Sequence, residues 1–140
     1  MDRQALAQAA GDAIWREDRA SRFLGMKLDE LKPGYARMTM TVTEQMANAQ
    51  ALCHGGLIFA LADSAFGFAC NSHNQRALAA SCSIDFLAPA HLGDRLIAEC
   101  QEQAHVGRTG IYDAKVTNQK GELIAVFRGK SATVKGKWVE

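Results

Sequence analysis

The segment from Leu57 to Cys70 limits the fold more than any other part of the chain. Its 14 residues are nearly all apolar, and their Ala and Leu content favours a helix over a strand. A helix that is apolar all round must be buried on nearly every side. The segment is interrupted by Asp63, Ser64 and Gly67 and is shorter than the roughly 20 residues that cross a bilayer. We therefore expect a core helix and no contact with membranes.

Alternating segments precede and follow this helix. A surface helix is expected over residues 2–21, and extended segments over residues 23–31 and 35–43 flank the turn signal Pro33-Gly34. From Ala77 onward a period of two indicates four strands, over about residues 77–86, 95–100, 110–118 and 122–134, with a hairpin turn at Gln119-Lys120-Gly121. No helix separates these strands, which implies antiparallel pairing. The prediction is an α+β fold in which an antiparallel sheet wraps around one buried helix.

Composition indicates one globular domain over residues 1–140, with a core over about residues 23–134. The chain has 48% apolar residues, two prolines and a net charge of +1 without blocks of like charge, which argues against a nucleic-acid partner. Four well-separated cysteines lack the spacing of zinc ligands, so free buried thiols are expected rather than a metal site or disulfides. The N-terminus lacks the pattern of a signal peptide, which favours a cytoplasmic location.

Asp63 is the only ionisable residue between Gly55 and Cys70. Carboxylates are rarely placed among apolar neighbours for stability, so a functional role is favoured. The alternative is a structural aspartate whose carboxylate is bonded to Ser64, Asn71 or a backbone amide.

The tripeptide His54-Gly55-Gly56 stands where the apolar helix should begin. Its glycines allow a ligand to approach backbone N–H groups at the positive end of the helix dipole, which suits an oxygen that gains negative charge. The alternative is a tight entry turn capped by His54.

Helix geometry separates these two candidates. Gly55 and Asp63 lie eight residues apart, which is about 12 Å along the axis and about 80° around it. One helix cannot bring both to one small reacting group. If both act on the same carbonyl, one must come from a second copy whose helix runs antiparallel, and the site then lies between subunits of a dimer.

Several short motifs between about Phe23 and Ala132 together point to a family. As a set they resemble the hotdog-fold acyl-CoA thioesterases, and they are most similar to the PaaI-type members of phenylacetate degradation. The motifs are Met46-Ala47-Asn48, Cys53-His54-Gly55-Gly56, Leu61-Ala62-Asp63, Ala69-Cys70-Asn71, Ser83-Ile84-Asp85-Phe86-Leu87, Gly110-Ile111-Tyr112-Asp113 and Phe127-Arg128-Gly129-Lys130-Ser131.

The resemblance implies a hotdog fold, in which five to six antiparallel strands wrap a long central helix, preceded here by an N-terminal helix. It also implies dimers with a continuous sheet that often join into tetramers, and hydrolysis of an aryl- or arylacetyl-CoA thioester without a metal or a bound cofactor. By this resemblance Asp63 is the catalytic carboxylate, Gly55 the backbone donor to the thioester oxygen, and His54 and Asn48 polar residues near that carbonyl.

The remaining site residues are candidates for binding substrate. Gly56 lies beside the backbone donor, and Ser64, Ser81 and Ser83 carry hydroxyls that can position a water molecule. The resemblance places Arg108, Arg128 and Lys130 in the strand region that holds the CoA phosphates. Candidates for the acyl pocket are Leu57, Phe59, Phe66 and Phe86.

Two other functions stay open from the sequence. One is a hotdog-fold dehydratase or hydratase, which generally uses histidine as its main base. The other is an acyl-CoA binding module without turnover. The pairing of His54-Gly55-Gly56 with Asp63 favours the thioesterase, acting on phenylacetyl-CoA or a ring-hydroxylated relative.

Overall fold

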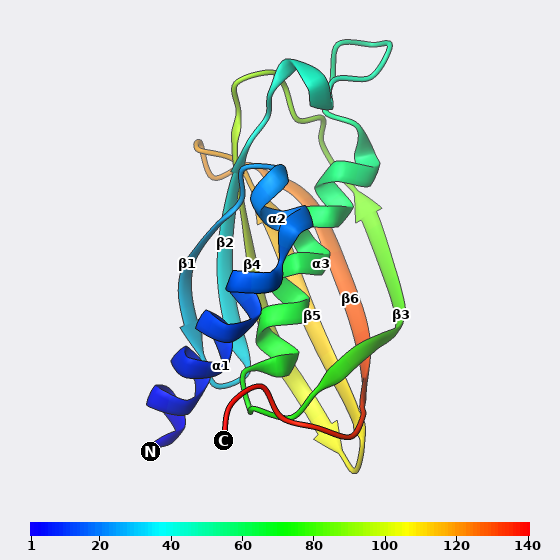
Figure 1. Cartoon of the computed structure of the whole chain (residues 1–140). Helices are drawn as coiled ribbons and strands as arrows, with labels where there is room; N and C mark the ends of the chain where they lie inside the picture. Colours follow the sequence, from blue (N-terminus) through cyan, green and yellow to red (C-terminus); the bar gives the residue numbers. More distant parts are fainter.

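One antiparallel sheet wraps around one helix in the computed structural model, which describes residues 1–140 (Figure 1). The helices are α1 (Arg3–Glu17), α2 (Arg19–Phe23) and α3 (Gly55–Asn71), with one 3₁₀ turn at Glu44–Met46. The strands are β1 (Lys27–Lys32), β2 (Tyr35–Thr41), β3 (Ala77–Phe86), β4 (Arg95–Val106), β5 (Thr109–Thr117) and β6 (Leu123–Thr133), in the sheet order β1-β2-β4-β5-β6-β3. The predicted sheet around a buried helix is confirmed, with six strands.

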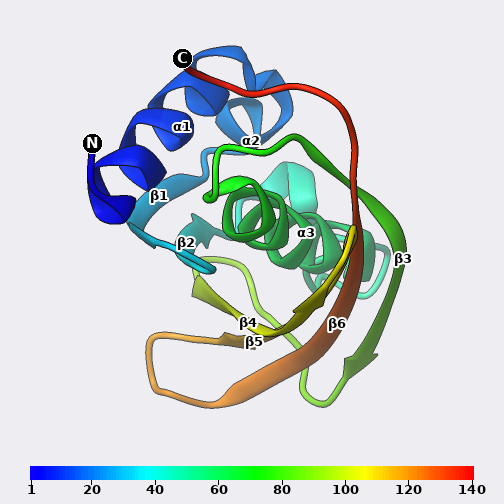
Figure 2. The same cartoon turned by 90° about the horizontal axis from the view of Figure 1, so that it is seen from below.

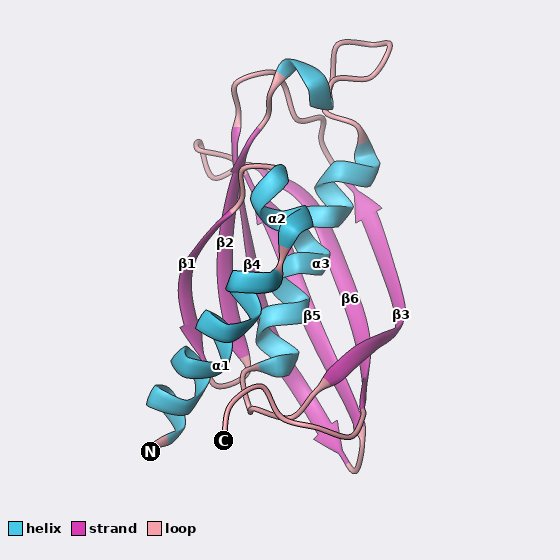
Figure 3. Cartoon of the chain, viewed as in Figure 1, coloured by secondary structure: helices cyan, strands magenta, loops and turns pink.

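The view along α3 shows how the helix is enclosed (Figure 2). The sheet curves around one side of α3, and α1 and α2 cover the side next to β1. At the other end of the sheet, β3 pairs only with β6 and is an edge strand. Figure 3 shows that loops alone join β3 to β4, as the absence of intervening helices predicts.

The core forms where α3 meets the middle of the sheet. The Phe66 ring is 1% exposed and packs against Tyr112 and Phe127, with ring centroids 5.6 and 5.8 Å away. A Cβ atom on Gly129 of β6 would lie 2.8 Å from the Phe66 ring. Glycine at this position therefore allows the ring to lie directly on the strand backbone.

Gly129→Ala should lower the free energy of unfolding by about 1–3 kcal/mol, because the enclosed Phe66 ring has no free space to move into. Urea unfolding measures this change. Gly67→Ala is the matched control, since a Cβ on Gly67 meets nothing within 4 Å and alanine favours a helix interior. Equal stability of the wild type and Gly129→Ala would contradict this packing account.

The N-terminal region differs from the prediction. The expected single helix over residues 2–21 is two helices, because the Asp18 side chain caps α2 by accepting from the Ser21 N–H. Phe23, expected to start a strand, is the last residue of α2 and is 88% exposed, and β1 begins only at Lys27. An acidic residue within the periodic pattern thus ends one helix and begins the next.

The other strands agree with the expected segments apart from their ends. β2 stops at Thr41 rather than residue 43, and β4 continues to Val106, well beyond the expected residue 100. The chain beyond the expected core also packs: the Trp138 indole N–H donates to the Asn71 side chain at 2.8 Å, over the C-terminal end of α3. No helix is long and apolar enough to span a bilayer.

Candidate active site

The N-terminal end of α3 carries the first part of the site. Two backbone bonds hold the entry to this helix: His54 N–H donates to the Met46 carbonyl at 2.7 Å, and Cys53 N–H donates to the Ala90 carbonyl at 2.9 Å. His54 caps the helix, and its Nδ1 accepts from the Gly56 N–H at 3.4 Å. The Gly55 N–H has no acceptor in the protein, so it can donate to a ligand.

A cavity of about 330 Å³ lies beside this free N–H. Its walls are mostly apolar: Leu52, Cys53, Ile58, Phe86, Leu87, Ala88, Pro89 and Ala90, together with Asn48 and Gly55. Phe86 of β3 lies so close to Gly55 that a Cβ there would be 3.1 Å from its ring. An apolar group can therefore enter here while a polar atom meets the helix terminus.

Asn48 organises the loop at one wall of this cavity. Its Oδ1 accepts from the N–H groups of Gln50 at 2.8 Å and Leu52 at 3.2 Å, so its own loop uses the acceptor side of the amide. The amide nitrogen has no partner in the protein and can donate toward the cavity. Asn48 and Gly55 thus line one cavity, with His54 and Gly56 on either side of Gly55 in the chain, and their roles in catalysis stay predictions.

Asp63 lies two turns further along α3, in a different environment. Its carboxylate accepts no hydrogen bond from the protein, so the alternative of a structural aspartate bonded to Ser64, Asn71 or a backbone amide finds no support. Burial, and secondarily the negative charge of Asp18, raise the pKa of Asp63 above its ordinary value of 3.8. An unpartnered carboxylate with a raised pKa is suited to take up a proton.

A single chain does not bring Asp63 to the Gly55 cavity. Asp63 is not among the residues that line that cavity, and helix geometry separates the two residues by about 12 Å. The expectation that each chain holds two halves of different sites stays a prediction.

The three candidate serines lie in two places. Ser64 follows Asp63 on α3, and its Oγ lies 2.8 Å from the Ser21 Oγ of α2. Ser81 and Ser83 lie opposite Lys130 and Arg128 on the outer face of the sheet, away from α3. Of the three serines only Ser64 is next to Asp63 in the same helix, and a role for the β3 serines stays a prediction.

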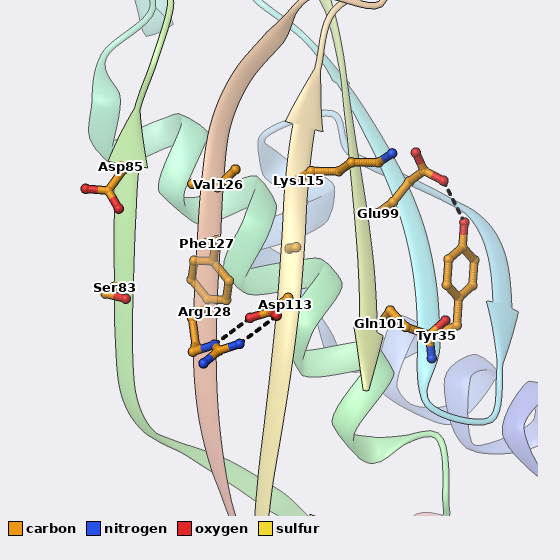
Figure 4. A pocket seen from close by; sticks show the side chains of 11 residues that line it. Tyr35, Ser83, Asp85, Glu99, Gln101, Asp113, Lys115, Val126, Phe127 and Arg128 are labelled. Carbon is orange, nitrogen blue, oxygen red and sulfur yellow. Dashed lines mark hydrogen bonds and ion pairs between the residues drawn. The ribbon is translucent and has the colours of Figure 1, made fainter. Parts of the chain in front are cut away.

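The three candidate cations also differ from one another. Arg128 donates to both carboxylate oxygens of Asp113, at 2.6 and 2.8 Å, and this pair lies on the outer sheet face (Figure 4). Exposed Lys130 and Arg108 make no ion pair. Arg108 lies in the β4–β5 turn, at the end of the sheet that faces the C-terminal end of α3 rather than Gly55 (Figure 1).

The expected acyl-pocket residues divide into wall and core. Phe86 is half-exposed and lines the cavity beside Gly55, whereas Phe66 is a core residue. Phe59 packs edge-on against Phe127 with ring centroids 5.5 Å apart, and Leu57 packs against the core.

Sequence reasoning missed Asp18 and Ser21, which connect α2 to Ser64. Asp18 accepts from both the backbone and the hydroxyl of Ser21. The signal was present, because aspartate is one of the residues preferred at a helix N-cap. Asp18 lies inside the helical periodicity of residues 2–21, which hides the start of a second helix. The contact between Ser21 and Ser64 joins residues 43 positions apart, and local patterns do not predict such contacts.

The cysteines are free, as predicted, and Cys53, Cys70 and Cys100 are buried. Burial above all raises the pKa of the Cys70 thiol to about 12, so this thiol stays protonated and is a poor nucleophile. No three His, Cys, Asp or Glu side chains lie close enough together to hold a metal ion.

Comparisons with known proteins agree with this geometry. Residues 50–125 match the family described as the thioesterase superfamily. The chain is 44% identical to the acyl-coenzyme A thioesterase PaaI of Escherichia coli K12 over 124 residues, which cover 89% of each protein. The chain belongs to the thioesterase superfamily. This membership confirms the predicted family and the predicted class of enzyme, a thioesterase.

Solved structures that superpose on the chain confirm the hotdog fold. The E. coli PaaI protein from the phenylacetic acid degradation operon superposes with a TM-score of 0.95 at 40% identity, over 97% of this chain and 99% of that one. A mutant of the phenylacetic acid degradation protein PaaI from Thermus thermophilus gives 0.81 at 34% identity, over 84% and 100%. The protein smu.793 from Streptococcus mutans UA159, bound to acetyl CoA, gives 0.76 at 27% identity, over 80% and 90%.

Proposed function

We propose that this protein is an acyl-CoA thioesterase that hydrolyses phenylacetyl-CoA, or a ring-hydroxylated phenylacetyl-CoA, to the free acid and CoA in phenylacetate catabolism. The observation that carries the proposal is the free Gly55 N–H at the end of α3, beside an apolar cavity, on the same helix as the unpartnered carboxylate of Asp63. The arylacetyl group is supported by the descriptions of the E. coli and Thermus relatives, which both refer to phenylacetic acid degradation. Free cysteines fit the reducing cytoplasm.

In the proposed mechanism the thioester carbonyl accepts from the Gly55 N–H, which stabilises the negative charge that develops on its oxygen. Because His54 Nδ1 accepts from the Gly56 N–H, the neutral ring carries its proton on Nε2 and can donate toward the same carbonyl. In one route Asp63 removes a proton from water, the water oxygen adds to the carbonyl carbon, the C–S bond breaks, and the CoA thiolate takes up the proton from Asp63. In the other, the Asp63 carboxylate attacks the carbonyl carbon and displaces the CoA thiolate, which takes a proton from water, and a second water opens the resulting anhydride to the free acid and Asp63. Both routes need only these groups and water.

A dimer with antiparallel α3 helices would unite Gly55 of one subunit with Asp63 of the other. Edge strand β3 supports this assembly, because one side of its ten-residue backbone pairs with no strand. Exposed Leu78, Phe86 and Leu87 lie along or just beyond it. Two β3 strands can pair to continue the sheet across the dimer.

We propose that such dimers join into a tetramer through the outer sheet face. Charges of alternating sign cross this face, from Asp85 through Arg128 and Asp113 to Lys115 and Glu99 (Figure 4). A surface with interspersed charges of both signs can meet a second copy of itself.

Mixed dimers test whether the site is shared. A dimer of one Gly55→Pro subunit and one Asp63→Asn subunit holds one intact site, so random exchange should restore about a quarter of wild-type activity from two inactive parents. Thiol release after subunit exchange, verified by mass spectrometry, measures this. No recovery in verified mixed dimers would contradict the shared site.

For the CoA phosphates, Lys130 and Arg108 are the better candidates, since neither forms an ion pair in the protein. Arg128 would have to leave its bidentate pair with Asp113 to bind phosphate.

A thiol-release assay across acyl-CoA substrates tests the function. The panel holds acetyl-, hexanoyl-, phenylacetyl- and hydroxyphenylacetyl-CoA, and we expect the arylacetyl substrates to lead by at least about tenfold in kcat/KM. A lead for the aliphatic substrates would overturn the proposed substrate. No release from any substrate, despite binding, would identify an acyl-CoA binding module, and water addition to an enoyl-CoA without thiol release would identify a hydratase.

A further inference from the structure

A chain of hydrogen bonds links helix α2 to the residue after Asp63. The Ser21 hydroxyl donates to the Asp18 carboxylate at 2.7 Å, and the Ser21 and Ser64 Oγ atoms lie 2.8 Å apart. Ser21 is 2% exposed, which protects the middle of this chain from competing water. The Ser21 N–H donates to the other Asp18 oxygen at 3.0 Å and fixes the carboxylate.

The charge of Asp18 sets the donor and acceptor roles in the hydrogen bonds that link Ser64, Ser21 and Asp18. An ionised carboxylate only accepts hydrogen bonds, so the Ser21 proton must point toward Asp18. The Ser21 oxygen is then free only to accept, and the Ser64 hydroxyl must donate to it. Ser64 then has only lone pairs left for a further partner. It directly follows Asp63 on α3, and the charge of Asp18 acts on Asp63 as well, so both residues lie near the N-terminal end of α2.

We infer that Asp18 and Ser21 are positioning residues for the hydrolysis, because they hold the Ser64 hydroxyl as an acceptor for the water that Asp63 deprotonates. Such a water donates one hydrogen to Asp63 and the other to Ser64, which fixes its orientation toward the carbonyl. This inference rests on the proposed function and on its general-base route, in which Asp63 removes a proton from water.

Asp18 also acts on Asp63 through its charge. Three titratable groups interact with the Asp63 carboxylate: Asp18, the N-cap of α2, Cys70 on α3 and Cys82 on β3. Burial first, and then the charge of Asp63, raise the pKa values of both thiols, so the thiols stay neutral. Asp18 is therefore the charged neighbour of Asp63. Its removal should lower the pKa of Asp63 and move the acid limb of the pH–rate profile to lower pH.

Asp18→Asn is the main test. The asparagine oxygen still caps α2, but its amide nitrogen now donates to the Ser21 hydroxyl. The Ser21 hydroxyl then donates to Ser64, and the Ser64 proton points away from Ser21. We expect kcat for phenylacetyl-CoA to fall about tenfold, KM to stay within about twofold, and the acid limb to shift downward. Asp2→Asn is the matched control, since Asp2 caps α1 by the same contact, at 2.7 Å to the Ala5 N–H, outside this chain. It should leave kcat and the pH profile unchanged.

A double variant separates positioning from a purely structural role. Ser64→Ala alone should lower kcat about as much as Asp18→Asn, and the combined variant should lose no more than Ser64→Ala. Additive losses would overturn the inference, as would wild-type kcat in Asp18→Asn. Asp63→Asn, assayed in parallel, distinguishes the two levels: if it is inactive while Asp18→Asn is fully active, the proposed function stands and only this inference fails.

Discussion

Asp63→Asn should lower kcat for the preferred acyl-CoA by about 10²–10⁴-fold while the protein still folds and binds substrate. The amide matches the carboxylate in shape but can neither accept a proton from water nor attack a carbonyl. The carboxylate forms no hydrogen bond in the protein, so this substitution removes no structural contact. Thiol release and calorimetric binding of a non-hydrolysable substrate analogue measure the two effects separately.

Asp12→Asn is the control for this variant, because Asp12 lies exposed on α1 and its only side-chain partner is Gln8. It should retain wild-type kcat. Unchanged turnover in Asp63→Asn would remove Asp63 from the mechanism.

Asp63→Asn should also make the fold more stable at neutral pH. The pKa of Asp63 is raised in the folded protein, mainly by burial, so ionisation of this group opposes folding. Below its unfolded value of about 3.8 the carboxyl is protonated in both states and there is no penalty. The penalty grows as the pH rises from there through the folded pKa and is complete above it. Asp63→Asn should therefore raise the midpoint of thermal unfolding at pH 7 more than at pH 4.

Gly55→Pro should lower kcat by about 10²–10³-fold, because it removes the backbone N–H that is proposed to stabilise the oxyanion. Gly55 is the first residue of α3, the position where proline is best tolerated in a helix. His54 already has φ −60° and ψ 131°, the extended conformation that precedes a proline. The helix should therefore form, and circular dichroism checks that it does.

Gly55→Ala is the matched control, since it keeps the N–H but brings the same Cβ to within 3.1 Å of Phe86. It measures the cost of crowding Phe86 alone. If alanine and proline lower kcat equally, crowding rather than the lost donor explains the effect, and the proposed role of the Gly55 amide fails.

Local patterns predicted most of the architecture. The apolar run after His54-Gly55-Gly56 became α3, and the alternation after Ala77 became four antiparallel strands, because burial on one or all sides imposes those patterns directly. The break at Asp18 was missed, since one polar residue in an amphipathic pattern is compatible with both a continuous helix and a new N-cap. The length of β4 was missed because its second half is mostly exposed and polar.

The candidate site was also predicted unevenly. Asp63 and Gly55 stood out because each contradicts its surroundings, one as a charge among apolar residues and the other as a flexible helix start. The ion pair between Arg128 and Asp113 was not predicted, because it joins residues on neighbouring strands. Charge and spacing in a sequence do not tell which opposite charge a cation will meet.

By itself, the sequence determined the buried helix, the strand alternation and the separation of Gly55 from Asp63, because helical rise and the burial of apolar surface follow from the order of residues alone. Only the tertiary structure decided that the Gly55 N–H is free beside a cavity, that Ser81 and Ser83 lie on the outer face, and that Asp18 reaches Ser64 through Ser21. Those facts depend on contacts between segments far apart in the chain, and such contacts exist only after the sheet has closed around α3.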